Sequence, residues 1–142
     1  MRLVLDTNVV VSAMLWNGAP RYLLQAGRER RIALFTSTPL LLELTEVLER
    51  RKFARKIAAA HMPLDRIVEQ YAGLSTVVRP LHVAGIAPDP DDDVVLGTAL
   101  AARADFVVTG DHGLLSVTCH QHVRLVDVRS ALDAMSRIPH EK

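Results

Sequence analysis

Residues 89–111 read DPDDDVVLGTALAARADFVVTGD, and this stretch decides the predicted fold. Its middle is almost wholly apolar, which predicts a buried helix over residues 91–104. The β-branched and aromatic residues that come next predict a strand over residues 106–109. A helix that leads directly into a strand is the repeating unit of folds with a parallel sheet. Aspartates stand at the start of this helix and directly after the strand.

The rest of the chain continues the alternation of strands and helices. Short apolar runs predict further strands over residues 2–6, 33–36, 76–80 and 123–126. Helical patterns cover residues 9–15, 20–29, 39–51, 53–60, 64–74 and 130–137. The predicted fold class is therefore α/β, with a mostly parallel central sheet flanked by helices on both faces. No repeat or linker divides the 142 residues, so residues 1–142 are expected to form a single domain.

Composition and charge restrict the class of protein. Hydrophobic residues make up 49% of the chain, which argues against disorder. No apolar run is long enough for a membrane span, and the first residues read as a strand rather than a signal peptide. The single cysteine, Cys119, cannot form an internal disulfide, and this fits a cytoplasmic location.

Basic residues are clustered although the formal net charge is only +1. One group comprises Arg28, Arg30 and Arg31, and a second comprises Arg50, Arg51, Lys52, Arg55 and Lys56. Each group is either a solvated helix face or a surface for a phosphate-rich polymer. We expect the second group to contact nucleic acid.

Four carboxylates stand where the predicted secondary structure changes or where a helix is otherwise apolar: Asp6, Glu43, Asp93 and Asp111. Asp6 and Asp111 follow strands, and in parallel sheets ligands bind beyond the carboxyl ends of strands. Glu43 has no basic residue three or four positions further along its helix. Asp93 directly precedes the apolar run, so it is the acid of the Asp89–Asp93 group best placed to face inward. A hard cation can hold several carboxylates together, whereas helix capping and turn formation explain each of them only singly.

Other phosphate-handling enzymes fit the sequence less well. A phosphatase of the haloacid dehalogenase type needs a second acid two residues after the first, and Asn8 stands there. A response-regulator receiver needs an acidic pair near Asp6 and a later lysine after a strand, and neither is evident. The sequence contains neither G-x-G-x-x-G nor G-x-x-x-x-G-K-[ST].

Three segments together resemble a PIN domain, the nuclease fold of many bacterial VapC-like toxins. They are LVLDTNVVVSA at residues 3–13, LLLELTEVLER at residues 40–50, and the stretch over residues 89–111. The resemblance implies that four acids are catalytic and bind metal, and that two polar residues support them. By this resemblance the acids are Asp6, Glu43, Asp93 and Asp111, and the supporting residues are Asn8 and Thr109.

The resemblance also implies an activity and partners. It implies a metal-dependent ribonuclease in which one or two Mg²⁺ or Mn²⁺ ions activate water for cleavage of RNA phosphodiester bonds. It further implies the toxin of a toxin–antitoxin pair, an antitoxin partner, and a homodimer. The alternative is a non-catalytic module that uses the same fold to bind RNA or a protein.

Overall fold

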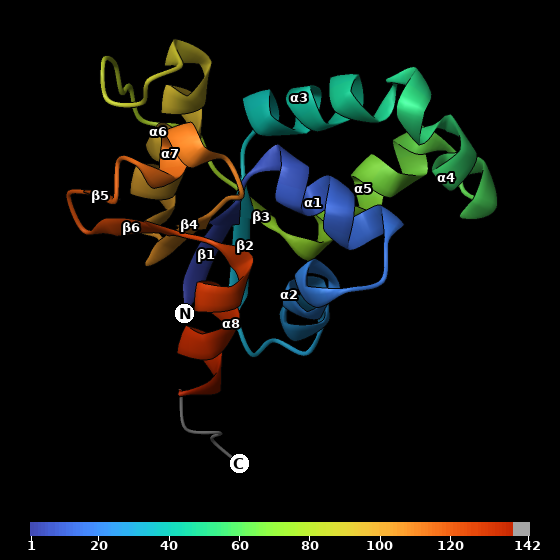
Figure 1. Ribbon diagram of the computed structural model, residues 1–142, viewed down its shortest axis with the longest axis horizontal. Helices are drawn as coiled ribbons and strands as arrows, with labels where there is room; N and C mark the ends of the chain where they lie inside the picture. The colour runs from blue at the N-terminus through green and yellow to red at the C-terminus, as the bar shows by residue number, and fades with distance from the viewer. Residues whose placement is uncertain (138–142) are drawn as a thin grey trace.

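The computed structural model describes residues 1–137 and shows a six-stranded sheet in the order β3-β2-β1-β4-β6-β5 (Figure 1). All neighbouring strands are parallel except β5 and β6, which are antiparallel. The strands are β1 (Arg2–Leu5), β2 (Ala33–Thr36), β3 (Thr76–Val77), β4 (Phe106–Val108), β5 (Cys119–His120) and β6 (Val123–Val126). The predicted mostly parallel sheet is confirmed.

Helices cover both faces of the sheet, and each face has its own hydrophobic core (Figure 1). Successive side chains of a strand point to opposite faces, so Leu3 and Leu5 enter one core while Val4 enters the other. The first core is packed by α1 (Thr7–Leu15), α2 (Ala19–Arg28), α3 (Thr38–Leu48), α5 (Leu64–Leu74) and α8 (Val128–Ser136). The second core is packed mainly by α6 (Asp93–Ala102) and α7 (His112–Leu115).

Several elements differ from the sequence prediction. The strand predicted over residues 76–80 ends at Val77, because the chain then turns away to cross α6, where the Leu81 amide donates to the Gly97 carbonyl at 3.0 Å. The helix predicted to reach Arg51 ends at Leu48 and is followed by the 3₁₀ turn η1 (Arg51–Phe53) and by α4 (Ala54–Ala59). The short elements α7 and β5 were not predicted. Their few residues give no periodic pattern to read.

The strand order places a topological switch point between β1 and β4. The chain leaves β1 toward β2 on one side, while β4 pairs with β1 on the other. In open α/β sheets the crevice at the carboxyl ends of such strands is the usual place for a ligand. None of the helices in residues 1–137 has the length and apolar character needed to span a bilayer.

Candidate active site

Asp6 stands at the carboxyl end of β1, directly at the switch point. Its carboxylate is buried and accepts two hydrogen bonds, from the Thr7 amide at 2.9 Å and from the Thr109 hydroxyl at 2.8 Å. Burial raises the pKa of the Asp6 carboxyl, these two hydrogen bonds oppose the rise, and the charge of Asp111 adds to it. The two hydrogen bonds therefore fix the orientation of the Asp6 carboxylate, while burial makes its ionised form less favourable than in water.

Thr109 connects the two strands that meet at the switch point. It is fully buried at the end of β4, and its hydroxyl accepts a hydrogen bond from the Asp111 amide at 3.0 Å while it donates to Asp6. Thr109, a predicted supporting residue, thus positions the backbone of Asp111 and the side chain of Asp6.

Asp111 lies after β4 and begins α7. One of its carboxylate oxygens accepts from the Leu114 amide at 2.9 Å, so the residue caps this short helix. The side chain is exposed, and its charge nevertheless raises the pKa of both Asp6 and Asp92. Asp111 therefore shares the electrostatic environment of the acids at the sheet edge.

Glu43 reaches the same region from the middle of α3. It is half-buried beside the stripe of α3 residues that enters the first core. Burial raises the pKa of the Glu43 carboxyl, the Thr7 hydroxyl opposes the rise, and the charges of Asp6, Glu46 and Asp91 increase it. The helix predicted from its apolar pattern thus brings an acid to Asp6 from a part of the chain about forty residues away.

Asp92 is a fourth acid within the electrostatic field of this group, and it was not among the residues predicted from the sequence. It ends the 3₁₀ turn η2 (Pro90–Asp92) just before α6. Partial burial and the charges of Asp6, Asp89, Asp111 and Glu43 raise the pKa of Asp92 to about 6. Three of these charges belong to the predicted site, so Asp92 lies within their field.

Asp93, the acid selected from sequence, has different partners. It is buried, and its carboxylate oxygens accept from the amides of Gly85, Ile86 and Ala87 at 3.0, 3.3 and 2.7 Å. These bonds tie the loop before η2 to the start of α6. Consecutive residues at a helix start point about 100° apart, so only one of the two neighbours faces the other acids.

Asn8 and the basic group at residues 50–56, which were also predicted from the sequence, make no hydrogen bond to the acids within residues 1–137. Asn8 is exposed in the first turn of α1, and its side chain has no hydrogen bond within residues 1–137. The basic group at residues 50–56 is exposed at the opposite end of α3, in η1 and α4 (Figure 1). Its five members are Arg50, Arg51, Lys52, Arg55 and Lys56.

The acids fit a hard divalent cation by their chemistry. Carboxylate oxygens are the ligands that Mg²⁺ and Mn²⁺ prefer. Burial and the charges of neighbouring acids raise the pKa of Asp6, Glu43 and Asp92, and a cation would stabilise their ionised forms. Within residues 1–137, however, no three His, Cys, Asp or Glu side chains stand close enough to hold an ion together. The acids therefore form an open group rather than a closed ligand cage.

Two solved structures have a similar fold. The structure of VapBC2 from Rickettsia felis bound to a DNA fragment from its promoter matches with a TM-score of 0.59 and 14% identity, over 89% of this chain and 98% of that chain. FitAcB from Neisseria gonorrhoeae matches with a TM-score of 0.56 and 20% identity, again over 89% of this chain and 98% of that one. A search of curated protein sequences finds no match.

The sequence signature of one family covers most of the chain. The PIN domain matches residues 2–113, which include β1, β4 and the four acids that share the switch point. The motifs noted in the sequence all lie within this match. The chain belongs to the PIN domain family.

Proposed function

We propose that this protein is a metal-dependent endoribonuclease that acts as the VapC-like toxin of a toxin–antitoxin pair. One observation carries the proposal: Asp6, Glu43 and Asp92, from three separate parts of the chain, each have a pKa raised by burial and further by the charges of neighbouring acids, and the charge of Asp111 acts on two of them. A fold gains nothing from such crowding, because like charges destabilise one another. Perturbed acids at a ligand-binding edge are typical of functional sites.

The polar residues of the site fall into two roles, holding metal ions and positioning other groups. Asp6, Glu43, Asp92 and Asp111 would hold one or two Mg²⁺ or Mn²⁺ ions. A bound ion of this kind lowers the pKa of water and offsets charge that develops on a phosphate. Thr109 orients the Asp6 carboxylate through its 2.8 Å hydrogen bond, and Asp93 holds the loop over residues 85–87 against α6. We therefore assign the fourth metal-facing position to Asp92 and a positioning role to Asp93.

The proposed substrate is RNA, and the exposed basic group at residues 50–56 is its proposed binding surface. Lys52 lies over the ring of Phe53 with 5.0 Å to the centroid, and Lys56 lies over Trp16 at 5.2 Å. None of the five cations forms an ion pair within the described part of the chain. Unpaired cations beside an accessible indole suit the phosphates and bases of a single strand.

The proposed partners are an antitoxin and a second copy of the chain. Support comes from the fold that the chain shares with the VapBC2 and FitAcB structures, together with the family match. An antitoxin that covers the acids would keep the nuclease inactive. Size-exclusion chromatography with light scattering measures whether the isolated chain is a homodimer.

The test compares acid variants of the purified protein on total RNA with Mn²⁺ or with EDTA. Asp6→Asn and Asp92→Asn should lower the cleavage rate by about a hundredfold or more, since each removes a charged ligand of the metal ion that would offset charge on the reacting phosphate. Asp133→Asn, an exposed acid on α8, is the matched control and should cleave like the wild type. Mapping of the cut ends then identifies the RNA class and the cleavage sequence.

Asp93→Asn separates the two neighbouring aspartates. It should lower the melting temperature, because three amides lose a charged acceptor, while cleavage by the folded fraction persists. If Asp92→Asn cleaves normally and Asp93→Asn is folded but inactive, Asp93 is the metal-facing acid. RNA binding without cleavage under any divalent ion would instead favour the non-catalytic binding module.

A further inference from the structure

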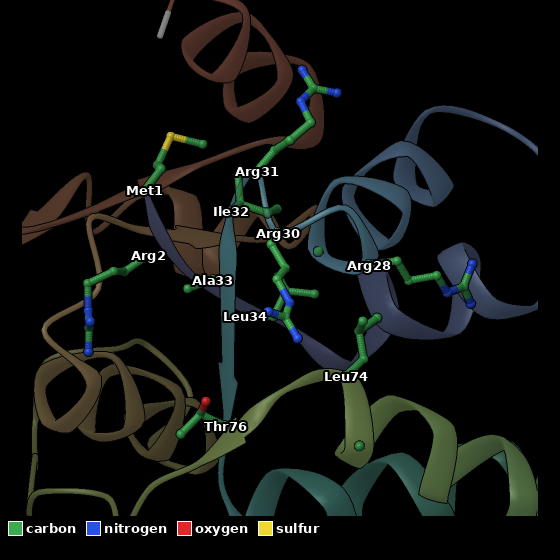
Figure 2. A pocket seen from close by; sticks show the side chains of 12 residues that line it. Met1, Arg2, Arg28, Arg30, Arg31, Ile32, Ala33, Leu34, Leu74 and Thr76 are labelled. Atoms are coloured by element: carbon green, nitrogen blue, oxygen red, sulfur yellow. The ribbon is translucent and has the colours of Figure 1, made fainter. Parts of the chain in front are cut away.

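The two ends of the sheet are built differently. At the amino ends of β1 and β2, a cavity of about 620 Å³ is lined by arginines whose side chains point apart (Figure 2). Two of them are engaged within the fold, since Arg2 donates to the Ala102 carbonyl and Arg31 pairs with Glu29. The carboxyl end, where the acids lie, instead buries polar side chains. The buried polar residues among residues 1–137 all lie at or beside that end: Asp6, Thr7, Thr36, Ser37, Asp93, Thr98 and Thr109.

Ser37 and Thr98 form a hydrogen bond that joins α3 to α6. Both side chains are fully buried, and their hydroxyl oxygens are 2.9 Å apart. The Thr98 hydroxyl donates its one proton to the Val94 carbonyl at 2.8 Å, so Ser37 is the donor to Thr98. Two consecutive hydrogen bonds thus run from the residue before α3 to the first turn of α6. Within residues 1–137, no other hydrogen bond connects these two helices.

The two helices carry acids to the site from opposite faces of the sheet. Glu43 lies on α3, which packs mainly in the first core through residues such as Leu44. Asp92 directly precedes α6, which packs in the second core through residues such as Leu96. Leu40, at the start of α3, reaches the second core, but apolar contacts have no direction. The hydrogen bond beside Leu40 therefore supplies the directional connection between the two helices.

Neither capping nor stability explains the pair of hydroxyls. Ser37 occupies the N-cap position of α3, where a serine hydroxyl usually accepts from a helix amide, yet its side chain makes no such bond. Two apolar groups of the same shape can replace a buried hydrogen-bonded pair at little cost in stability. A satisfied polar pair differs from an apolar one in specifying a single arrangement of the groups around it.

We propose that Ser37 and Thr98 are positioning residues, which hold α3 and α6 in the arrangement that lets Glu43 and Asp92 share a divalent ion. The inference rests on the proposed metal-dependent function, and it adds two residues that contact neither the ion nor RNA. Loss of the bond should therefore act on ion affinity, as loss of the outer partners of metal ligands does.

The test measures Mn²⁺ binding to the purified protein, below its melting temperature, by electron paramagnetic resonance of the free ion. The double variant Ser37→Ala with Thr98→Val replaces both hydroxyls by apolar groups of similar size. It should keep about the melting temperature of the wild type in EDTA, because no buried polar group is left unpaired. Its dissociation constant for Mn²⁺ should nevertheless rise by about tenfold or more. RNA cleavage at limiting Mn²⁺ should fall in proportion.

Thr98→Ser separates the hydroxyl from the stability of the fold. It keeps the hydroxyl but leaves a cavity, so it should lower the melting temperature and change Mn²⁺ affinity by less than about twofold. Stability and ion affinity thus change independently in the two proteins. If Mn²⁺ affinity follows the melting temperature in both, the role of the pair is structural and the inference fails.

Thr45→Val is the matched control. The Thr45 hydroxyl donates to the Leu41 carbonyl at 3.0 Å, the same intrahelical bond that Thr98 makes, but it connects α3 to no other element within the described residues. It should change Mn²⁺ affinity by less than about twofold. Wild-type affinity in the double variant, or an equal loss in Thr45→Val, would overturn the positioning role alone. A wild-type protein that neither binds Mn²⁺ nor cleaves RNA would overturn the proposed function and the positioning role together.

Discussion

At the scale of single residues, Asp92 and Asp93 show how neighbouring identical side chains take different roles. Asp93 is 5% exposed and satisfies three amides of a loop, so its charge is used within the fold. Asp92 is half-buried, and its burial together with the charges of other carboxylates raises its pKa to about 6. The first arrangement stabilises the folded chain, and the second is destabilising unless a cation is present.

This difference predicts how stability depends on pH when divalent ions are absent. The ordinary pKa of the Asp92 carboxyl is 3.8 and folding raises it to about 6, so the folded state holds the proton more tightly. Asp92 therefore contributes fully to stability below pH 3.8. Its contribution falls as the pH rises from 3.8 to about 6, and it stays reduced at higher pH. In EDTA, Asp92→Asn should raise the melting temperature at pH 7.5 and leave it unchanged at pH 3.5.

At pH 7.5, Mn²⁺ should make the melting temperature of the wild type higher than that of Asp92→Asn, the reverse of the order in EDTA. The wild type should gain thermal stability because the ion binds only the folded site, and Asp92→Asn should gain less. Differential scanning calorimetry with and without Mn²⁺ measures both effects. Identical pH profiles for the two proteins in EDTA would show that Asp92 does not lie in the field of the other acids.

At the scale of elements, a close backbone contact on α6 positions the segment that follows β3. A Cβ on Gly97 would lie 2.1 Å from the Leu81 carbonyl oxygen, so the chain crosses the helix where no side chain intervenes. The Leu81 amide also donates to the Gly97 carbonyl at 3.0 Å. This crossing leads into the loop whose amides bind Asp93.

Gly97→Ala should therefore destabilise the protein, by about 1–3 kcal/mol as for other overpacked sites. Backbone cannot move aside as a flexible side chain does, and displacement of Leu81 also disturbs the loop at Asp93. The matched control is Gly73→Ala on α5, where a Cβ meets nothing within 4 Å. That variant should gain about 0.5–1 kcal/mol from the lower entropy of alanine in the unfolded chain. Urea unfolding measures both, and a neutral Gly97→Ala would contradict the close contact.

At the scale of the whole molecule, α1 and α3 connect the acids to the basic group. α1 begins beside Asp6 and ends next to Trp16, a separation of about 15 Å along the helix axis. α3 carries Glu43 and leads into η1 and α4, where the cations lie (Figure 1). The two helices pack against the same core and so fix the distance between the candidate acids and the proposed RNA surface.

Neutralisation of two of these cations should weaken RNA binding and reduce its salt dependence. In an Asp92→Asn background, Arg51→Gln with Arg55→Gln should make the slope of log K against log salt shallower by about 1.4, as expected for two lost phosphate contacts with a single strand. The control pair, Arg124→Gln with Arg129→Gln, removes two exposed cations of β6 and α8. If both pairs lower the slope equally, RNA does not use the basic group at residues 50–56.

The sequence by itself determined the fold class and the order of most elements, and it proposed Asp6, Glu43, Asp93 and Asp111 as a candidate site. Hydrophobic periodicity and the positions of acids at strand ends are local signals, so they are readable without coordinates. The same signals missed β5 and α7, which are too short to be periodic, and extended β3 beyond the point where contact with α6 ends it.

Only the tertiary structure placed Asp93 against three loop amides and Asp92 in the field of the other acids, and it showed the arginine-lined cavity at the other sheet edge. The direction of Asp92 or Asp93 depends on where the 3₁₀ turn ends and α6 begins, and a shift of one residue rotates a side chain by about 100°. The cavity joins the ends of α2 and α5 with the amino ends of two strands, which are distant in sequence. Local residue patterns carry no information on such distances, because these are set by the packing of helices on the sheet.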